Sequence, residues 1–203
     1  EECLRAGLLC NDSHLQEQDG QYTIVGDPTE GALIVVAQKA GLSRQVLETQ
    51  MPRLAVIPFE SQFQYMATLH QTGSGNTIYV KGSMEAIFKR CDRLVNAQGQ
   101  LEPLERDRIE RRAEAVAKQG LRILAFAKKS VPAAQQSLEH SDLDRGLVFL
   151  GLQGMIDPPR SAAIAAVRSC QSAGIQVKMI TGDHPLTATA IARMMKLSQR
   201  AEV

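Results

Sequence analysis

Lys81 and Phe59, near the middle of the chain, have types and positions that could bind a ligand. Lys81 ends a predicted strand, and Ser83 just after it can cap a helix over 84–89. A lysine beside the free backbone amides of a helix start can bind an anion. Phe59, one strand earlier, offers an aromatic face. The alternative is structural, because most strand phenylalanines are buried and most lysines are solvated at an edge.

A predicted β-hairpin positions Lys81. Its strands are residues 65–70 and 77–81, and the Gly73-Ser74-Gly75-Asn76 cluster between them is typical of a turn. Side chains of the second strand alternate between two faces, with Ile78 and Val80 on one and Thr77, Tyr79 and Lys81 on the other. We therefore expect one face to pack and the other to stay open.

Glu30 is the candidate acidic residue, in the segment Gly26-Asp27-Pro28-Thr29-Glu30-Gly31. Asp27 can be the N-cap of a helix that runs through Ala32–Lys39, with Pro28 at its first position. Glu30 can then close a capping box with Asp27. Its carboxylate could instead contact a ligand, and the local pattern leaves both roles open.

Chemistry is also possible at Thr181-Gly182-Asp183, near the end of the chain. The pattern predicts a helix over 161–173, a strand over 175–181 and a helix over 185–197. Strand, glycine turn and helix make half of a parallel α/β unit, and ligands of such sheets bind at the carboxyl ends of strands. A Gly-Asp turn alone is common and carries little weight.

The remaining elements must hold these residues in place. Arg122 lies in a predicted strand, 121–127, and could be either an ordinary exposed residue or a contact for an anion. The apolar run 147–152 predicts a second strand, buried on both faces. Asp157-Pro158-Pro159-Arg160 indicates a stiff hinge between two parts of the chain. Further predictions are helices over 2–9, 44–50 and 104–119, a strand over 53–59 in which Pro58 indicates a sheet edge or a strand end, and a polar loop over 130–145.

Composition narrows the class of protein. The 203 residues suit one sizeable domain, or one domain and part of another, and 44% hydrophobic content can build a core. A net charge of +1 favours neither a nucleic acid nor a membrane surface as partner. No apolar run approaches the roughly 18 residues of a spanning helix, and no signal peptide opens the chain, which begins at Glu1 within a pattern. The four scattered cysteines lack metal-site spacing and indicate reduced thiols in the cytosol.

Taken together, these motifs resemble one family. Gly26-Asp27-Pro28-Thr29-Glu30, Phe59, Lys81-Gly82, Leu121-Arg122, Asp157-Pro158-Pro159-Arg160 and Met179-Ile180-Thr181-Gly182-Asp183 follow one another in that order. The chain resembles the cytoplasmic part of a P-type cation-transporting ATPase, and most closely the type II branch of calcium and sodium/potassium pumps. The resemblance covers essentially the whole chain, and it is specific because several modest motifs stand in register.

This resemblance implies an α+β fold. Residues 1–152 would form a nucleotide-binding domain, lacking its first residues, with a twisted antiparallel sheet flanked by helices. Residues 153–203 would be the hinge, Asp157, Pro158, Pro159 and Arg160, and part of a phosphorylation domain with the haloacid-dehalogenase-like Rossmann fold. The incomplete second domain could form dimer contacts through its exposed edges.

The resemblance also implies an ATP site. Adenine would stack on Phe59 with Lys81 deep in the pocket, Glu30 near the adenine amino group and Arg122 on the phosphates. Thr181 would lie near the γ-phosphate. The full set of implied nucleotide-binding residues is Glu30, Phe59, Ser61, Gln64, Met66, Lys81, Gly82, Arg122, Thr181, Gly182 and Asp183.

Several features of the family pattern are absent from the sequence. No Asp-Lys pair occurs, so the Asp-Lys-Thr-Gly-Thr motif of the phosphorylated aspartate is missing, as is the Gly-Asp-Gly-x-Asn-Asp motif that helps hold Mg²⁺. Many relatives carry a basic residue where this chain has Gln64, and some carry an arginine in place of Ser61. The grip on a triphosphate is therefore expected to be weak.

The function expected from the sequence is ATP binding within a P-type pump. The parent would transfer the γ-phosphate of Mg²⁺-ATP to an aspartate and transport a cation. The chain itself is expected to bind ATP without hydrolysing it, to partner the rest of the pump, and to bind neither nucleic acid nor a metal of its own. The alternatives are a phosphatase or phosphotransferase of the haloacid-dehalogenase type, which would need its nucleophile before the 175–181 strand, and a non-catalytic interaction module.

Overall fold

The structure is a computed structural model that describes residues 1–73, 75–182 and 185–197. Asp183, one of the predicted site residues, lies outside the described residues. Contacts between residues divide the chain into two compact units. The first unit comprises Glu1–Leu104 and Leu124–Gln153, and the second comprises Glu105–Ile123 and Gly154–Val203. Helix 106–117 thus belongs to the second unit, and the predicted division at 152/153 stays a prediction.

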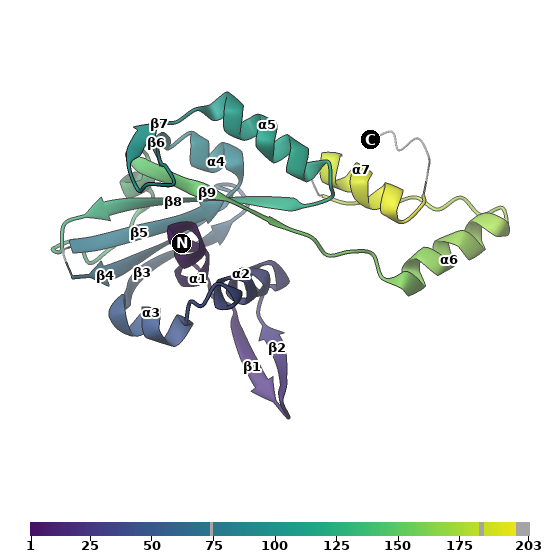
Figure 1. Cartoon of the computed structure of the whole chain (residues 1–203), viewed down its shortest axis with the longest axis horizontal. Coiled ribbons are helices and arrows are strands. Elements are labelled where there is room, and N and C mark those ends of the chain that lie inside the picture. Colours follow the sequence, from purple (N-terminus) through teal and green to yellow (C-terminus); the bar gives the residue numbers. More distant parts are fainter. Residues whose placement is uncertain (74, 183–184, 198–203) are drawn as a thin grey trace. The chain divides into compact units, whose positions relative to one another are not determined.

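The first unit is built on a mostly antiparallel sheet (Figure 1). In the described residues it has seven strands in the order β3-β4-β5-β8-β9-β6-β7, and β6 pairs with β9 in parallel. The strands are β3 (Arg53–Glu60), β4 (Tyr65–Thr72), β5 (Gly75–Gly82), β6 (Cys91–Val95), β7 (Leu101–Pro103), β8 (Arg122–Val131) and β9 (Leu147–Met155). The predicted hairpin is thus confirmed as β4–β5, and β3 lies at a sheet edge, one of the two positions that Pro58 left open.

Helices flank this sheet. Figure 1 shows α1 (Glu2–Leu9), α2 (Pro28–Lys39) and α3 (Arg44–Gln50) gathered on one side, and α4 (Met84–Phe88) on the other. A separate hairpin, β1 (His14–Gln18) and β2 (Gln21–Val25), extends from the base of α2, and the loop before β9 contains a short 3₁₀ helix, η1 (His140–Leu143). This arrangement confirms the α+β class with a mostly antiparallel sheet.

The prediction that one face of β5 stays open is wrong. Tyr79, on the face expected to be open, is only 1% exposed, and Lys81 beside it is also buried. Helix α1 packs on β5 from this side, and the Tyr79 hydroxyl donates a hydrogen bond to Glu2 Oε1 at 2.8 Å. Alternation of side chains along a strand does not reveal which helices will cover each face, so both faces of β5 became core.

Local sequence determines where α2 begins. Asp27 Oδ1 accepts hydrogen bonds from the backbone amides of Thr29 (2.8 Å) and Glu30 (3.2 Å), as the N-cap prediction required. The second half of the predicted capping box is wrong, because the Glu30 carboxylate binds groups outside its own helix. Ser43 precedes α3 without a side-chain cap, whereas the Ser83 hydroxyl caps α4 through the Ala86 amide.

The prediction for β9 is also wrong in part. Its burial pattern is mainly intermediate, with Leu147 and Phe149 buried and most other residues half exposed. A continuous apolar run indicates a strand, but it cannot show how much of each face the neighbouring elements cover.

The second unit contains α5 (Arg106–Ala117), α6 (Ser161–Ser172) and α7 (Pro185–Met194). The Thr187 hydroxyl on α7 donates to the Leu121 carbonyl oxygen at 3.2 Å, just after α5. Residues 175–182 form no strand, so the strand predicted over 175–181 is wrong. Ile180 is 98% exposed, as expected of a segment that is not packed as a strand of a sheet. The predicted α/β unit is therefore not observed here.

Helices long and apolar enough to cross a bilayer do not occur among the described residues.

Gly82 allows β5 to approach the start of β4 closely. A Cβ atom on Gly82 would overlap the Gln64 carbonyl oxygen and would lie 2.8 Å from Tyr65 Cβ. The Ser83 amide donates to the same carbonyl oxygen at 3.0 Å, which keeps the two chain segments together. Glycine is therefore required here for close approach of two backbones rather than for a special φ.

We expect Gly82→Ala to lower the free energy of unfolding by about 1–3 kcal/mol, because backbone atoms must separate. Gly73→Ala is the matched control, since no heavy atom lies within 4 Å of its added Cβ, and its effect should stay within about 0.5 kcal/mol. Urea denaturation followed by circular dichroism measures both. Equal midpoints for the two variants would contradict the close-packing argument.

His70 is a buried ionisable residue of β4. Its Nδ1 lies 3.0 Å from the Met51 carbonyl oxygen and its Nε2 lies 2.9 Å from Thr68 Oγ1. Burial lowers the pKa of His70 to about 4, because the charged ring would lose its hydration. The folded protein therefore keeps this ring neutral well below the pKa of 6.5 that an unfolded histidine has.

From this difference we expect stability to fall as the pH drops from 6.5 toward 4. In that window the unfolded chain binds a proton at residue 70 and the folded chain does not. The free energy of unfolding therefore has its full value above pH 6.5 and decreases progressively as the pH falls toward 4. The loss attributable to His70 should be about 2 kcal/mol between pH 6.5 and pH 5. Urea denaturation of wild type and His70→Gln at several pH values measures it, and parallel pH profiles of the two proteins would disprove the assignment.

Candidate functional site

The register of the β4–β5 hairpin brings several predicted site residues together. Met66 pairs directly with Lys81, and Gln64 immediately precedes the last pair of the hairpin, in which Tyr65 faces Gly82. Residues directly opposite in an antiparallel pair share one face of the sheet, so Met66 and Lys81 are neighbours. Phe59 lies at the same end of the sheet, near the end of edge strand β3.

Lys81 is buried, and it forms an ion pair with Glu30. Its side chain is 8% exposed, and Nζ donates to Glu30 Oε1, on a side chain that is 16% exposed. The alternative that Lys81 is a solvated edge charge is therefore wrong. A buried ammonium is stable only with a partner, and the first turn of α2 supplies it.

The second carboxylate oxygen of Glu30 has three donors. Oε2 accepts hydrogen bonds from the Asp12 amide at 3.0 Å and from the amide and hydroxyl of Ser13, both at 2.9 Å. Burial alone would raise the pKa of Glu30, but Lys81 and these donors outweigh burial and lower the pKa. The carboxylate is therefore ionised and held in one orientation.

Phe59 presents its ring to solvent. It is 60% exposed, so the alternative that it belongs to the core is wrong. An exposed aromatic side chain is suited to a flat ligand that can stack on the ring. The usual pattern of burial is thus reversed, because the apolar Phe59 is exposed and the charged Lys81 is buried.

The turn between β3 and β4 supplies the rest of this surface. The Gln64 amide donates to the Glu60 carbonyl oxygen at 2.8 Å, and Gln64 adopts a left-handed φ of 59°. Its side-chain Oε1 accepts from the Ser83 hydroxyl at 3.3 Å. Ser61 and Gln64 are exposed, whereas Met66 is buried under the surface beside Lys81.

The other predicted site residues belong to the second unit. Arg122 is exposed at the start of β8, and Thr181 and Gly182 lie in the extended segment between α6 and α7. The predicted hinge, residues 157–160, is an irregular segment between β9 and α6. The structure thus groups Glu30, Phe59, Ser61, Gln64, Met66, Lys81 and Gly82 in the first unit, and the ATP roles of all of these residues stay predictions.

Residues 11–13 contribute to this site although nothing in the sequence pattern indicates it. Asn11 and Ser13 are both buried, and Ser13 with Asp12 supplies the donors to Glu30. Three consecutive polar residues after α1 resemble an ordinary surface loop. Only the fold shows that they meet Glu30, which lies 17 to 19 positions later in the chain.

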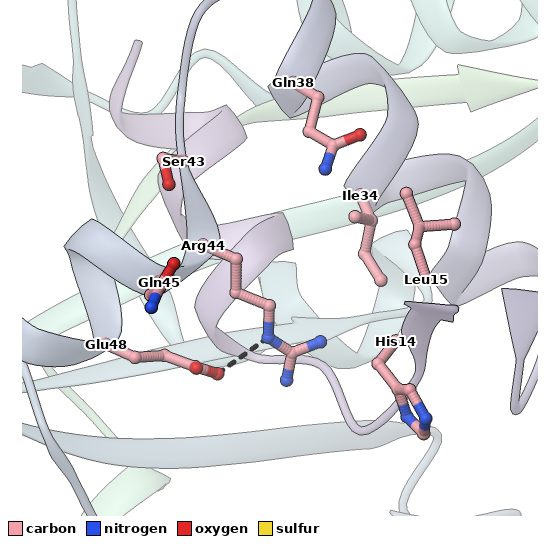
Figure 2. Close-up of a pocket in the computed structure, with 8 residues that line it drawn as sticks. All are labelled: His14, Leu15, Ile34, Gln38, Ser43, Arg44, Gln45 and Glu48. Carbon is pink, nitrogen blue, oxygen red and sulfur yellow. Dashed lines mark hydrogen bonds and ion pairs between the residues drawn. The ribbon is translucent and has the colours of Figure 1, made fainter. Parts of the chain in front are cut away.

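A hollow of about 460 Å³ begins at His14 and Leu15, which directly follow this polar segment (Figure 2). Figure 2 shows the Arg44 side chain extending from α3 toward the start of β1, with its Nε bound to Glu48 at 2.6 Å. The remaining lining comes from β1, α2 and the start of α3. In the parts of the chain that the structure describes, no three His, Cys, Asp or Glu residues cluster as a metal site would require.

The sequence matches the family model described as "P-type ATPase, cytoplasmic domain N" over residues 1–162. This description agrees with the expected cytoplasmic location.

Similar proteins are cation pumps by name. The chain is 55% identical over 202 residues to "Cation-transporting ATPase pma1" of Synechocystis sp., covering 100% of this chain and 22% of that protein. It is 44% identical over 199 residues to "Probable cation-transporting ATPase F" of Mycobacterium tuberculosis, covering 98% of this chain and 22% of that one. For the "Calcium-transporting ATPase" of Bacillus subtilis the identity is 36% over 201 residues, with 97% and 22% covered. The chain thus spans about a fifth of the length of these relatives, and it belongs to the P-type cation-transporting ATPase family.

Proposed function

We propose that the surface formed by Phe59, Lys81 and Glu30 binds the adenosine part of ATP, within a pump that transports a cation. The observation that carries this proposal is the exposed Phe59 ring at the same end of the sheet as a buried lysine whose charge Glu30 neutralises. Aromatic stacking with a polar floor suits a purine better than it suits a phosphate.

Hydrogen-bonding capacity remains at the base of this surface. Among the described residues Glu30 Oε1 accepts from Lys81, and an ionised carboxylate oxygen can accept a second bond. The adenine amino group is a suitable donor for it. An ammonium carries three hydrogens, so Lys81 can bind Glu30 and still donate to a ring nitrogen of the base.

The phosphate end of the nucleotide would meet weaker groups in the first unit. Gln64 and Ser61 are exposed at the β3–β4 turn and carry no charge. We assign Arg122, Thr181, Gly182 and Asp183 to the phosphates and ribose on the family resemblance. Mg²⁺ would arrive with ATP rather than at a site of its own.

For the parent pump we propose the reaction that the family resemblance implies. The γ-phosphate of ATP would pass to an aspartate, and the aspartyl phosphate would drive transport of a cation. Because the sequence has no Asp-Lys-Thr-Gly-Thr motif, this chain would recognise ATP without turning it over. Residues 153–203 would contribute part of the haloacid-dehalogenase-like phosphorylation domain, and the rest of the pump would be its partner.

Replacing Phe59 tests the stacking surface. We expect Phe59→Ala to weaken ATP binding by about 1–3 kcal/mol, or roughly 5- to 150-fold, because the base loses its aromatic platform. Val56→Ala is the matched control, since Val56 is an exposed apolar residue of the same strand that lines a different hollow, beside η1. Isothermal titration calorimetry measures both. Unchanged ATP affinity in a folded Phe59→Ala variant would refute the site, and ATP turnover by the wild-type chain would refute the recognition-only role.

Gln64 provides a test of how the binding energy is distributed. We expect wild type to bind ATP, ADP and AMP with similar affinities, around 0.1–1 mM, because the uncharged turn adds little for each phosphate. Gln64→Lys should tighten ATP by roughly 0.5–2 kcal/mol and AMP by less, with a steeper salt dependence. Gln64→Glu should act in the opposite direction at the same position.

Titrations of the three proteins with the three nucleotides at low and high salt decide the matter. A wild type that already prefers ATP over AMP by tenfold or more would show that phosphate contacts dominate. In that case Arg122 would be the next residue to replace.

A further inference from the structure

Ser13 is bound from two sides by residues that are distant in the sequence. Its amide and hydroxyl both donate to Glu30 Oε2 at 2.9 Å, and its carbonyl oxygen accepts from Arg44 Nη1. Only 1% of the Ser13 surface is exposed. The residue therefore stands between the Lys81–Glu30 pair and helix α3, and it cannot shift without breaking contacts on both sides.

Arg44 fixes the backbone of this segment. Besides the Ser13 carbonyl oxygen, its guanidinium binds the Asn11 carbonyl oxygen at 3.2 Å, and Glu48 holds Nε at 2.6 Å (Figure 2). Arg53 adds a second clamp through Nη2, which donates to the same Asn11 oxygen at 2.6 Å. Two arginines on different elements thus hold one short stretch of backbone in place.

Asn11 ties the same stretch to α1 and α2. Its buried Nδ2 donates to the Gly7 carbonyl oxygen at 3.1 Å and to the Glu30 carbonyl oxygen at 2.9 Å. Its Oδ1 accepts from the Ser13 amide at 3.0 Å. The backbone of Glu30 and the donors to its carboxylate therefore belong to one connected network.

Gly26 confines the Ser13 hydroxyl. A Cβ on Gly26 would overlap Ser13 Oγ and would lie 2.8 Å from Ser13 Cβ, so the two residues are in close contact. The glycine also adopts a φ of 119°, which other residues rarely take. The hydroxyl is therefore kept against α2, where Glu30 Oε2 and, at 3.3 Å, the Asp27 carbonyl oxygen are its acceptors.

We propose that Ser13, held by Arg44, is a positioning residue that orients the Glu30 carboxylate and so selects 6-amino purine nucleotides over 6-oxo purine nucleotides. This inference rests on the proposed function, because it assumes that the base of the nucleotide lies against Glu30. A carboxylate accepts a hydrogen bond from a 6-amino group but repels the oxygen of a 6-oxo group. That discrimination depends on the direction of Oε1, and three donors on Oε2 set this direction.

The test compares ATP with inosine triphosphate, which differs at the 6-position. Isothermal titration of wild type, Ser13→Ala, Ser13→Thr and Arg44→Gln supplies the affinities. We expect wild type to prefer ATP, and Ser13→Ala and Arg44→Gln to reduce the ratio of affinities about three- to tenfold through weaker ATP binding. Ser13→Thr keeps the hydroxyl and should retain most of the preference. Thr72→Ala is the control, since its hydroxyl donates to the Gly75 carbonyl oxygen at the turn of the β4–β5 hairpin.

A readout that needs no nucleotide accompanies this comparison. The pKa of the Glu30 carboxyl, followed by carbon-13 NMR, should rise toward its ordinary value in Ser13→Ala and stay low in Thr72→Ala, because a donor to the carboxylate is lost. Equal loss of ATP and inosine triphosphate affinity in folded Ser13→Ala would indicate a merely structural role and overturn the inference. An unchanged Glu30 pKa would also overturn it. A wild type that binds neither nucleotide would refute the proposed function instead.

Discussion

The burial of the Lys81 charge is the constraint on which the rest of the first unit depends. An ammonium group removed from water costs several kcal/mol unless an anion and further hydrogen bonds compensate it. Glu30 is that anion, and it comes from the first turn of α2, so the ion pair joins the start of α2 to the end of β5. The carboxylate in turn needs donors, and residues 12 and 13 supply them. One buried charge thus fixes a helix start, a loop and a strand end relative to one another.

Neutralisation within the protein also shapes what the surface can bind. Lys81 forms its ion pair with Glu30, so its positive charge is largely neutralised before any ligand binds. What remains for a ligand is the exposed ring of Phe59 and a small number of directional hydrogen-bonding positions. Under the proposed function, such a surface would recognise the shape and edge of a flat base more than it would attract phosphate. Gln64 at the neighbouring turn is also uncharged, so it too would add little attraction for phosphate.

Local signals predicted the elements, and long-range packing decided the site. The helix starts were predicted correctly from Asp27 with Pro28 and from Ser83, because capping is a contact between near neighbours in the sequence. The covered face of β5 was not predictable, since it depends on α1, some 70 residues earlier. The strand expected over 175–181 is absent for a related reason: alternation of apolar residues makes a stable strand only where a neighbouring strand pairs with it, and the sequence does not show whether one does.

The segment Gly26–Gly31 shows how a local motif can carry a long-range meaning. As a helix start it requires only Asp27 and Pro28. Its two glycines are explained by partners elsewhere, because Gly26 makes room for Ser13 and Gly31 makes room for the Ile24 side chain of β2. Glu30 adds the ion pair with β5. The segment therefore connects a helix, a hairpin and the central sheet. The capping pattern visible in the sequence reports only the contacts between neighbouring residues, and the contacts with Ser13, Ile24 and Lys81 appear only in the fold.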